Sequence, residues 1–224
     1  MNKKTWIALF LLTLALHIAS DYLPLSYLSY ITKPLLMILL LTGFISASKG
    51  LHSALKKWVI IALIFSWVGD VLLMFQEKEP LFFLLGLSAF LLAHIFYILF
   101  FHGIKKEESI SSRWWLLVPV VVYYTVLIGV LYPHLADMKV PVPVYGIVIS
   151  FMLLLALHTL FIKNKTAGQW MAAGAMFFII SDSVLAINKF YQSFEAANII
   201  IMLTYGLAQL FIVLGAIHYF RNKV

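Results

Sequence analysis

The chain is dominated by long, unbroken blocks of apolar residues that are separated by short charged stretches. An α-helix needs about 20 apolar residues to cross the hydrocarbon layer of a bilayer, and these blocks have that length. Of the 224 residues, 63% are hydrophobic and only 11% are charged, whereas roughly 25% of the residues of a soluble domain are charged. The blocks are too uniformly apolar for the alternating strands of a membrane β-barrel. The sequence therefore predicts an all-α, polytopic helical bundle in a membrane.

The apolar blocks divide into about eight predicted transmembrane helices. Residues 1–224 are expected to form a single integral membrane domain. The apolar run that follows Met1 is interpreted as the first span, because no small-residue cleavage site followed by a polar mature domain is present. The predicted spans are Thr5–Tyr22, Pro34–Ser48, Trp58–Phe75, Leu81–Phe101, Trp114–Tyr132, Val140–Ile162, Gly168–Ile187 and Asn198–Phe220.

Basic residues alternate between the two sides of this predicted bundle. With the N-terminus in the cytoplasm, twelve of the 16 Lys and Arg residues fall in cytoplasmic segments and four fall on the outer side. This is the positive-inside pattern, so both termini are expected to be cytoplasmic, in the inner membrane if the source is bacterial. The +7 net charge is explained by helix-end pairs rather than by a basic patch, so no nucleic-acid partner is expected. The outer four residues are Lys33, Lys78, Lys139 and Lys189.

Two similar segments hint at an internal duplication. The segment Gly69–Phe75, which contains Asp70, ends one predicted span, and Asp182 lies near the end of another. The two aspartates are 112 residues apart, and both spans run from the inside to the outside. Two parallel four-helix repeats, 1–110 and 111–224, produce this arrangement, as in several transporter folds. The alternative is coincidence in an apolar sequence of low diversity.

Asp70 and Asp182 are the two acidic residues that lie within the hydrophobic part of the predicted spans; the other seven lie in loops or, for Asp21, at the edge of a span. A carboxylate at mid-membrane costs at least about 2.5–3.5 kcal/mol, so it normally faces a protein interior or a water-filled cavity. Both aspartates lie roughly 8–10 Å from the outer ends of their helices, and two carboxyls at one depth suit acid–base chemistry. The structural alternative is that each carboxyl only bonds neighbouring hydroxyls, from Ser66, Ser181 and Ser183.

Other polar side chains reach the same outer half of the predicted bundle. Lys33 opens the second predicted span, where a cation can meet a lipid phosphate or simply snorkel to the interface. Tyr145 lies near the outer end of the sixth span, where tyrosines commonly form the interfacial belt. Asn198, Tyr205 and Gln209 line the eighth span, and helix-to-helix hydrogen bonds are the alternative to a functional role for them.

The intramembrane histidines do not form a metal-binding motif. His17, His94, His158 and His218 fall in four different spans, and no two of them make an HxxxH pair. We predict no metal site, with the convergence of three histidines on one ion as the open alternative. His94 is retained as a candidate for substrate binding. The chain has no cysteine and no glycine-rich phosphate loop, so no cofactor is expected.

Several of these segments resemble a known family. The segments Phe65–Leu73 (FSWVGDVLL) and Ser181–Ala186 (SDSVLA) resemble the two signature segments of the YhhN-type lysoplasmalogenase family. Each further segment is weak alone, but the ordered set covers nearly the whole chain. The supporting segments are Thr32–Leu35, Ala93–Tyr97, Pro143–Tyr145 and Thr204–Gln209.

The resemblance implies an eight-helix membrane enzyme that hydrolyses the vinyl ether bond of lysoplasmalogens. The products are then a fatty aldehyde and a glycerophospho-choline or -ethanolamine, so the partners are a lysophospholipid substrate and the surrounding membrane lipids. The resemblance also implies that the catalytic residues are Asp70 and Asp182, with Lys33, Tyr145, Tyr205 and Gln209 as lesser candidates.

Acid-catalysed hydrolysis of a vinyl ether suits a pair of carboxyls, one protonated and one ionised, much as glycosidases use theirs. We assign Asp70, which follows Gly69 among apolar groups, as the acid and Asp182, between two serines, as the carboxylate. The rival interpretation is a small proton-coupled transporter or exporter, since intramembrane aspartates also form proton relays. A third is a membrane scaffold whose polar residues only join helices.

Overall fold

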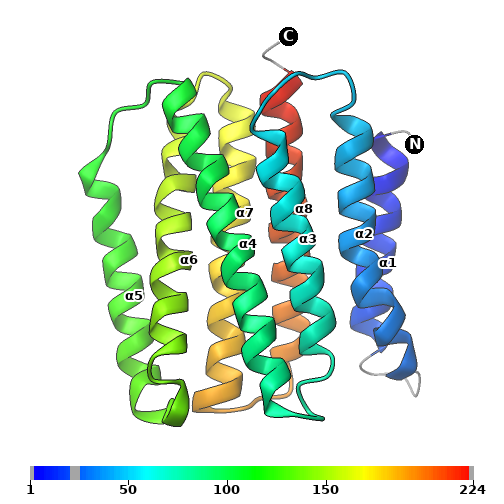
Figure 1. The fold of residues 1–224 in the computed structure, drawn as a ribbon, viewed down its shortest axis with the longest axis vertical. Helices are drawn as coiled ribbons and strands as arrows, with labels where there is room; N and C mark the ends of the chain where they lie inside the picture. Colours follow the sequence, from blue (N-terminus) through cyan, green and yellow to red (C-terminus); the bar gives the residue numbers. More distant parts are fainter. Residues whose placement is uncertain (1–2, 21–25, 222–224) are drawn as a thin grey trace. The chain divides into compact units, whose positions relative to one another are not determined.

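The computed structural model describes residues 3–20 and 26–221. These two ranges contain eight α-helices and no β-strand (Figure 1), so the predicted all-α class is confirmed. The end of the first predicted span, at Tyr22, lies outside the described residues. The helices are α1 (Lys3–Ser20), α2 (Ser29–Ala47), α3 (Lys56–Leu73), α4 (Pro80–Glu107), α5 (Leu117–Leu131), α6 (Pro141–His158), α7 (Lys165–Ala186) and α8 (Ala197–Arg221).

Most of these helices are long and apolar enough to cross a membrane. Within the described ranges six helical segments meet that condition, so the chain is an integral, multi-pass membrane protein. The apolar part of α1, Thr5–Ser20, is shorter, and α3 carries three charged residues in its 18 positions. The crossing of the membrane by α1 and α3 stays a prediction. The six segments are Ser29–Ala47, Pro80–Glu107, Trp114–His134, Pro141–Phe161, Lys165–Tyr191 and Ala197–Arg221.

The second helix begins earlier than the sequence suggested. We predicted a start at Pro34, but α2 begins at Ser29, after a 3₁₀ turn at Ser26–Leu28. A proline inside a helix removes the hydrogen bond to the carbonyl four residues earlier, here that of Tyr30. Because Tyr30 is the second residue of α2, only a bond at the very end of the helix is lost, and the helix tolerates the proline.

The chain forms two compact units. Unit 1 comprises Met1–Phe100 and Ala216–Val224, and unit 2 comprises Phe101–Gly215. The boundaries between the units fall inside α4 and α8, whereas the predicted halves join at residues 110 and 111. The internal duplication stays a prediction.

Four helices meet at one end of unit 1. Trp6, near the start of α1, packs so closely on α2 that a Cβ added to Gly43 would lie 2.6 Å from its ring. The rings of Phe44 and Phe100 lie 6.3 and 6.0 Å from that of Phe220, close to the end of α8. The start of α1 therefore lies at the same end of the unit as Phe100 of α4 and the ends of α2 and α8. This agrees with the expectation that both termini lie on one side of the membrane; the identity of that side stays a prediction.

Glycines allow helix backbones to approach one another in both units. In unit 1, Gly69 of α3 lies under the Phe90 ring of α4, which an added Cβ would meet at 2.7 Å. In unit 2, Gly174 of α7 lies against α8, where an added Cβ would come within 2.8 Å of the Ala208 carbonyl oxygen. Close packing through small residues is the usual way in which membrane helices associate, because lipid removes most of the hydrophobic driving force between them.

The tightest approach of backbone to backbone predicts a difference in stability between two glycine substitutions. Gly168 lies in the first turn of α7, and in Gly168→Ala the new Cβ overlaps the carbonyl oxygen of Thr159. We expect the free energy of unfolding to fall by about 1–3 kcal/mol. Thr159 cannot move freely, because its hydroxyl donates to the Ala156 and Gly168 carbonyls at 2.6 and 3.1 Å. Thermal unfolding in detergent measures the change.

Gly129→Ala in α5 is the matched control, because a Cβ added there meets nothing within 4 Å. Alanine favours a helix over glycine by up to about 1 kcal/mol, so this variant should be as stable as the wild type or slightly more so. Equal melting temperatures for the two variants would contradict the predicted clash.

Candidate functional site

Asp182, one of the two intramembrane aspartates, accepts a hydrogen bond from a neighbouring helix. The hydroxyl group of Tyr145, in the first turns of α6, donates to Oδ2 of Asp182 in α7. Both side chains are half-buried in unit 2. A donor from a neighbouring helix satisfies a carboxyl oxygen inside a membrane bundle, where lipid offers no hydrogen bond. The structure thus brings together two of the residues that the sequence singled out, although we had no specific reason to pair them.

An apolar cluster at one end of unit 2 positions this contact. Leu131, Leu135 and Val142 are buried there. Ala186, the last residue of α7, and Phe190, in the π-helical turn Ile187–Tyr191 that follows, pack against them. The cluster joins the connection between α5 and α6 to α7, so it fixes the first turns of α6 beside the last turns of α7. Tyr145 directly precedes Gly146, which packs on α5: a Cβ added to Gly146 would meet the Tyr124 ring at 3.1 Å.

A second tyrosine reaches the same part of α7 and was missed by the sequence analysis. The hydroxyl oxygen of Tyr123 in α5 lies 2.9 Å from Oγ of Ser183. Ser183 donates its own proton to the Ile179 carbonyl at 2.5 Å, so Tyr123 is the donor in this pair. The signal was a phenol in the middle of a valine-rich span, where a buried hydroxyl needs a partner.

The two serines beside Asp182 have other tasks than the one expected of them. We expected them to bond the carboxyl. Instead, Ser181 donates to the Ile201 carbonyl of α8 at 3.0 Å, and Ser183 donates within α7. The hydroxyl that donates to Asp182 comes from Tyr145. The serines therefore join α7 to α8 and α5, and this holds Asp182 in place.

Two of the three candidate residues in α8, Tyr205 and Gln209, are buried. The Tyr205 ring packs edge-on against Phe178 of α7, with 5.6 Å between the ring centroids, and Phe178 lies one helical turn before Asp182. Gln209, one turn after Tyr205, is fully buried. Asn198 is exposed in the first turn of α8. The structure thus groups Tyr205 with the Asp182 region and leaves Asn198 at the end of the helix.

The other intramembrane aspartate lies in unit 1. Asp70 is 2% exposed, in the last two turns of α3, and Ser66 one turn earlier is fully buried. Its neighbour Gly69 holds α3 against Phe90 of α4. His94, one turn beyond Phe90, is also fully buried. Because α4 is antiparallel to α3 and Phe90 packs on Gly69, His94 lies about one turn further from the outer end of α3 than Asp70 does. This is the greater depth that the sequence suggested.

Lys33 lies inside α2 rather than at its start. It is the fifth residue of the helix, half-buried, and shares a helix face with Met37 one turn later. The neighbouring Thr32 faces α1, where its hydroxyl oxygen lies 2.9 Å from Nδ1 of His17. That hydrogen bond fixes the rotation of α2 about its axis, and with it the direction in which Lys33 projects.

Two of the four intramembrane histidines join neighbouring segments. His17 bonds Thr32. His158 donates from Nδ1 to the Leu154 carbonyl at 2.7 Å and accepts at Nε2 from the Arg113 N–H at 3.1 Å. Across the described ranges no group of three His, Asp or Glu side chains could hold a metal ion.

Comparison with known proteins gives several relatives that are similar to this chain in sequence. A human protein named lysoplasmalogenase TMEM86B is 33% identical over 186 residues, which is 81% of this chain and 73% of the human protein. A mouse protein of the same name is 29% identical over 227 residues, 96% of this chain and 87% of its own. A Mycobacterium bovis lysoplasmalogenase is 31% identical over 163 residues, 71% of this chain but only 60% of the mycobacterial protein.

No solved structure matches the chain significantly. The sequence model of the YhhN family matches residues 28–216, a range that contains both aspartates, Lys33, His94 and Tyr145. The match extends over most of the chain and includes the segments on which the resemblance rested. The chain therefore belongs to the YhhN family.

Proposed function

We propose that this protein is a membrane-embedded hydrolase that cleaves the vinyl ether bond of lysoplasmalogens. The observation that carries the proposal is the hydrogen bond between Tyr145 and Asp182 inside a membrane helix bundle, in a chain whose relatives are named lysoplasmalogenases. The substrate is then a lysophospholipid with an alkenyl chain, taken from the membrane in which the protein resides. For a bacterial source that membrane is the inner membrane.

The reaction begins with transfer of a proton to the carbon of the double bond that is not attached to the ether oxygen. The resulting oxocarbenium ion is captured by water, which loses a proton and gives a hemiacetal. The hemiacetal collapses to a fatty aldehyde and the alcohol of the glycerophospho-compound. One carboxyl must therefore arrive protonated, and a second must be ionised to stabilise the cation and accept a proton from water.

Two residues have surroundings that suit these roles. Asp70, almost fully buried beside Gly69, is proposed as the proton donor. Asp182 is proposed as the carboxylate, because the Tyr145 hydroxyl donates to it and so meets an oxygen that acts as an acceptor. Tyr145 then keeps the Asp182 carboxylate in one orientation, and Tyr123 supports the same turn of α7 through Ser183.

Substitution of either aspartate tests the two-carboxyl mechanism. We expect Asp70→Asn and Asp182→Asn each to lower kcat for aldehyde release about 100-fold or more, since general acid–base catalysis contributes roughly 10²–10⁴-fold. Asp137→Asn is the control, because Asp137 is an exposed carboxyl in the α5–α6 connection, and it should keep wild-type activity. A folded Asp70→Asn protein with an intact single-turnover rate would remove Asp70 from the mechanism.

Loss of the tyrosine hydroxyl should reduce the chemical step without abolishing it. In Tyr145→Phe the ring remains and the donor to Asp182 is lost. A hydrogen bond to a charged group is worth about 1.5–3 kcal/mol, so kcat should fall roughly 10- to 100-fold. Tyr132→Phe, at a tyrosine that is 49% exposed, should change kcat less than about twofold. Equal activity of the two variants would show that Tyr145 is an interfacial residue only.

A role for Lys33 in binding the substrate phosphate predicts a separate kinetic effect. Lys33→Ala should raise KM by about tenfold and change kcat little, because a phosphate contact persists from the ground state to the transition state. Lys78→Ala is the control: Lys78 is exposed and its ammonium group lies over the Phe75 ring at 5.0 Å. Equal loss of kcat and kcat/KM in Lys33→Ala would instead place the lysine in the transition state.

A further inference from the structure

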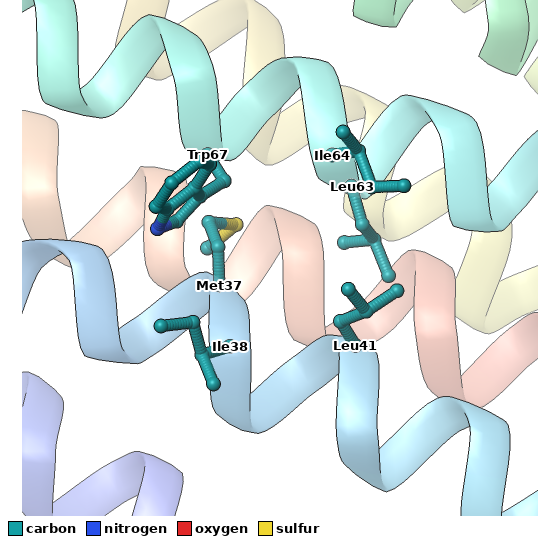
Figure 2. Close-up of a pocket in the computed structure, with 6 residues that line it drawn as sticks. All are labelled: Met37, Ile38, Leu41, Leu63, Ile64 and Trp67. Carbon is teal, nitrogen blue, oxygen red and sulfur yellow. The ribbon is translucent and has the colours of Figure 1, made fainter.

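An apolar groove runs between α2 and α3 in unit 1 (Figure 2). Its volume is about 280 Å³, just below the roughly 300 Å³ at which small-molecule sites begin, so it suits a stretch of alkyl chain better than a whole lipid. Ile38 and Ile64 are 43% and 42% exposed along it, so the groove is open on one side. The lining residues are Met37, Ile38, Leu41, Leu63, Ile64 and Trp67.

The two helices are antiparallel, and three contacts set their register. At the outer end, the rings of Tyr30 and Phe75 lie 6.2 Å apart. In the groove itself, Met37 lies beside Trp67, and Leu41 lies opposite Leu63 (Figure 2). The residue numbers of each facing pair add to nearly the same value, as they must between two antiparallel helices.

This register places Lys33 and Asp70 at one level, between the Tyr30–Phe75 contact and the groove. On α2, Lys33 lies one turn before Met37, on the same face. On α3, Asp70 lies three residues after Trp67 and seven after Leu63, again on the groove-lining face. A cation and the proposed proton donor therefore both adjoin the outer end of an apolar groove.

We propose that the groove holds the alkenyl chain of the substrate. This inference rests on the proposed function and adds the location of the chain. The phosphate group meets Lys33, the vinyl ether lies at the level of Asp70, and the chain runs inward between α2 and α3. This arrangement agrees with the lipid, whose phosphate and vinyl ether both lie at one end of the molecule and whose hydrocarbon extends away from them.

The dimensions of the groove set the part of the chain that it contacts. Seven residues separate Leu63 from Asp70, so the inner end of the groove lies roughly 10 Å from the level of Asp70, about the length of eight carbons of an extended chain. Because the tail leaves one apolar medium for another, the groove adds little affinity. Its effect is to align the vinyl ether with Asp70, and misalignment by about 1 Å can lower a rate 100-fold.

Three isoleucines of similar exposure allow a matched test with full-length protein. Ile38→Trp and Ile64→Trp place a large ring in the groove from α2 and from α3. Ile45→Trp, at a site on α2 that is 49% exposed and does not line the groove, is the control. All three isoleucine side chains are partly exposed, so none of the substitutions forces a tryptophan ring into the packed core. Melting temperature in detergent verifies folding.

The measurement is aldehyde release from lysoplasmalogens with a long or a short alkenyl chain. We expect Ile38→Trp and Ile64→Trp to lower kcat/KM for a hexadecenyl substrate about tenfold or more, and for a butenyl substrate less than about twofold. Ile45→Trp should leave both unchanged. An equal loss for the two chain lengths, or equal behaviour of Ile38→Trp and Ile45→Trp in an active protein, overturns the proposal.

A labelling experiment separates failure of this inference from failure of the proposed function. The probe is a saturated-ether lysophosphatidylcholine with a diazirine at the eighth carbon, which cannot be hydrolysed as a vinyl ether. We expect light to label peptides of α2 and α3 in the wild type and in Ile45→Trp, and much less in Ile38→Trp. A wild type that releases no aldehyde overturns the proposed function. Labels outside α2 and α3, or label on α2 and α3 that Ile38→Trp leaves unchanged, overturn the groove assignment whether or not the protein is active.

Discussion

A carboxyl group inside a membrane bundle must obtain its hydrogen bonds from the protein, because lipid supplies none. The Tyr145–Asp182 hydrogen bond meets that requirement across two helices, and much of unit 2 serves to make it possible. The cluster around Leu131 and Val142 joins the α5–α6 connection to the end of α7. Ser181 ties α7 to α8, and Ser183 meets Tyr123 of α5. These contacts hold the Tyr145 hydroxyl within hydrogen-bond distance of the Asp182 carboxyl.

The predictable part of the fold was the part that a one-dimensional pattern determines. Apolar blocks gave the helices and their order, and isolated charges within them marked Asp70 and Asp182. The predicted start of α2 at Pro34 was wrong, because a proline this near the beginning of a helix removes only the bond to the Tyr30 carbonyl and does not end the helix. Hydropathy carries no information about that backbone bond. Hydropathy likewise places a tyrosine such as Tyr145 at a depth, but not on a particular side of its helix.

The site was only partly predictable for a related reason. Which side chains meet depends on the rotation and register of separate helices, and these are set by packing contacts such as Gly146 on Tyr124. Sequence proximity made Ser181 and Ser183 look like the partners of Asp182, yet adjacent residues on a helix point in different directions. Tyr123 escaped notice because its partner, Ser183, lies 60 residues away in the chain.

The open side of the α2–α3 groove determines the route by which the lipid substrate enters it. A chain that enters between Ile38 and Ile64 moves sideways within the bilayer and never crosses water. Its supply then depends on the mole fraction of the lipid in the membrane, not on its concentration in solution. The two products also separate by phase: the aldehyde stays among the acyl chains, whereas the head-group alcohol dissolves in water. Reversal then requires two molecules from different phases to meet again at one buried position.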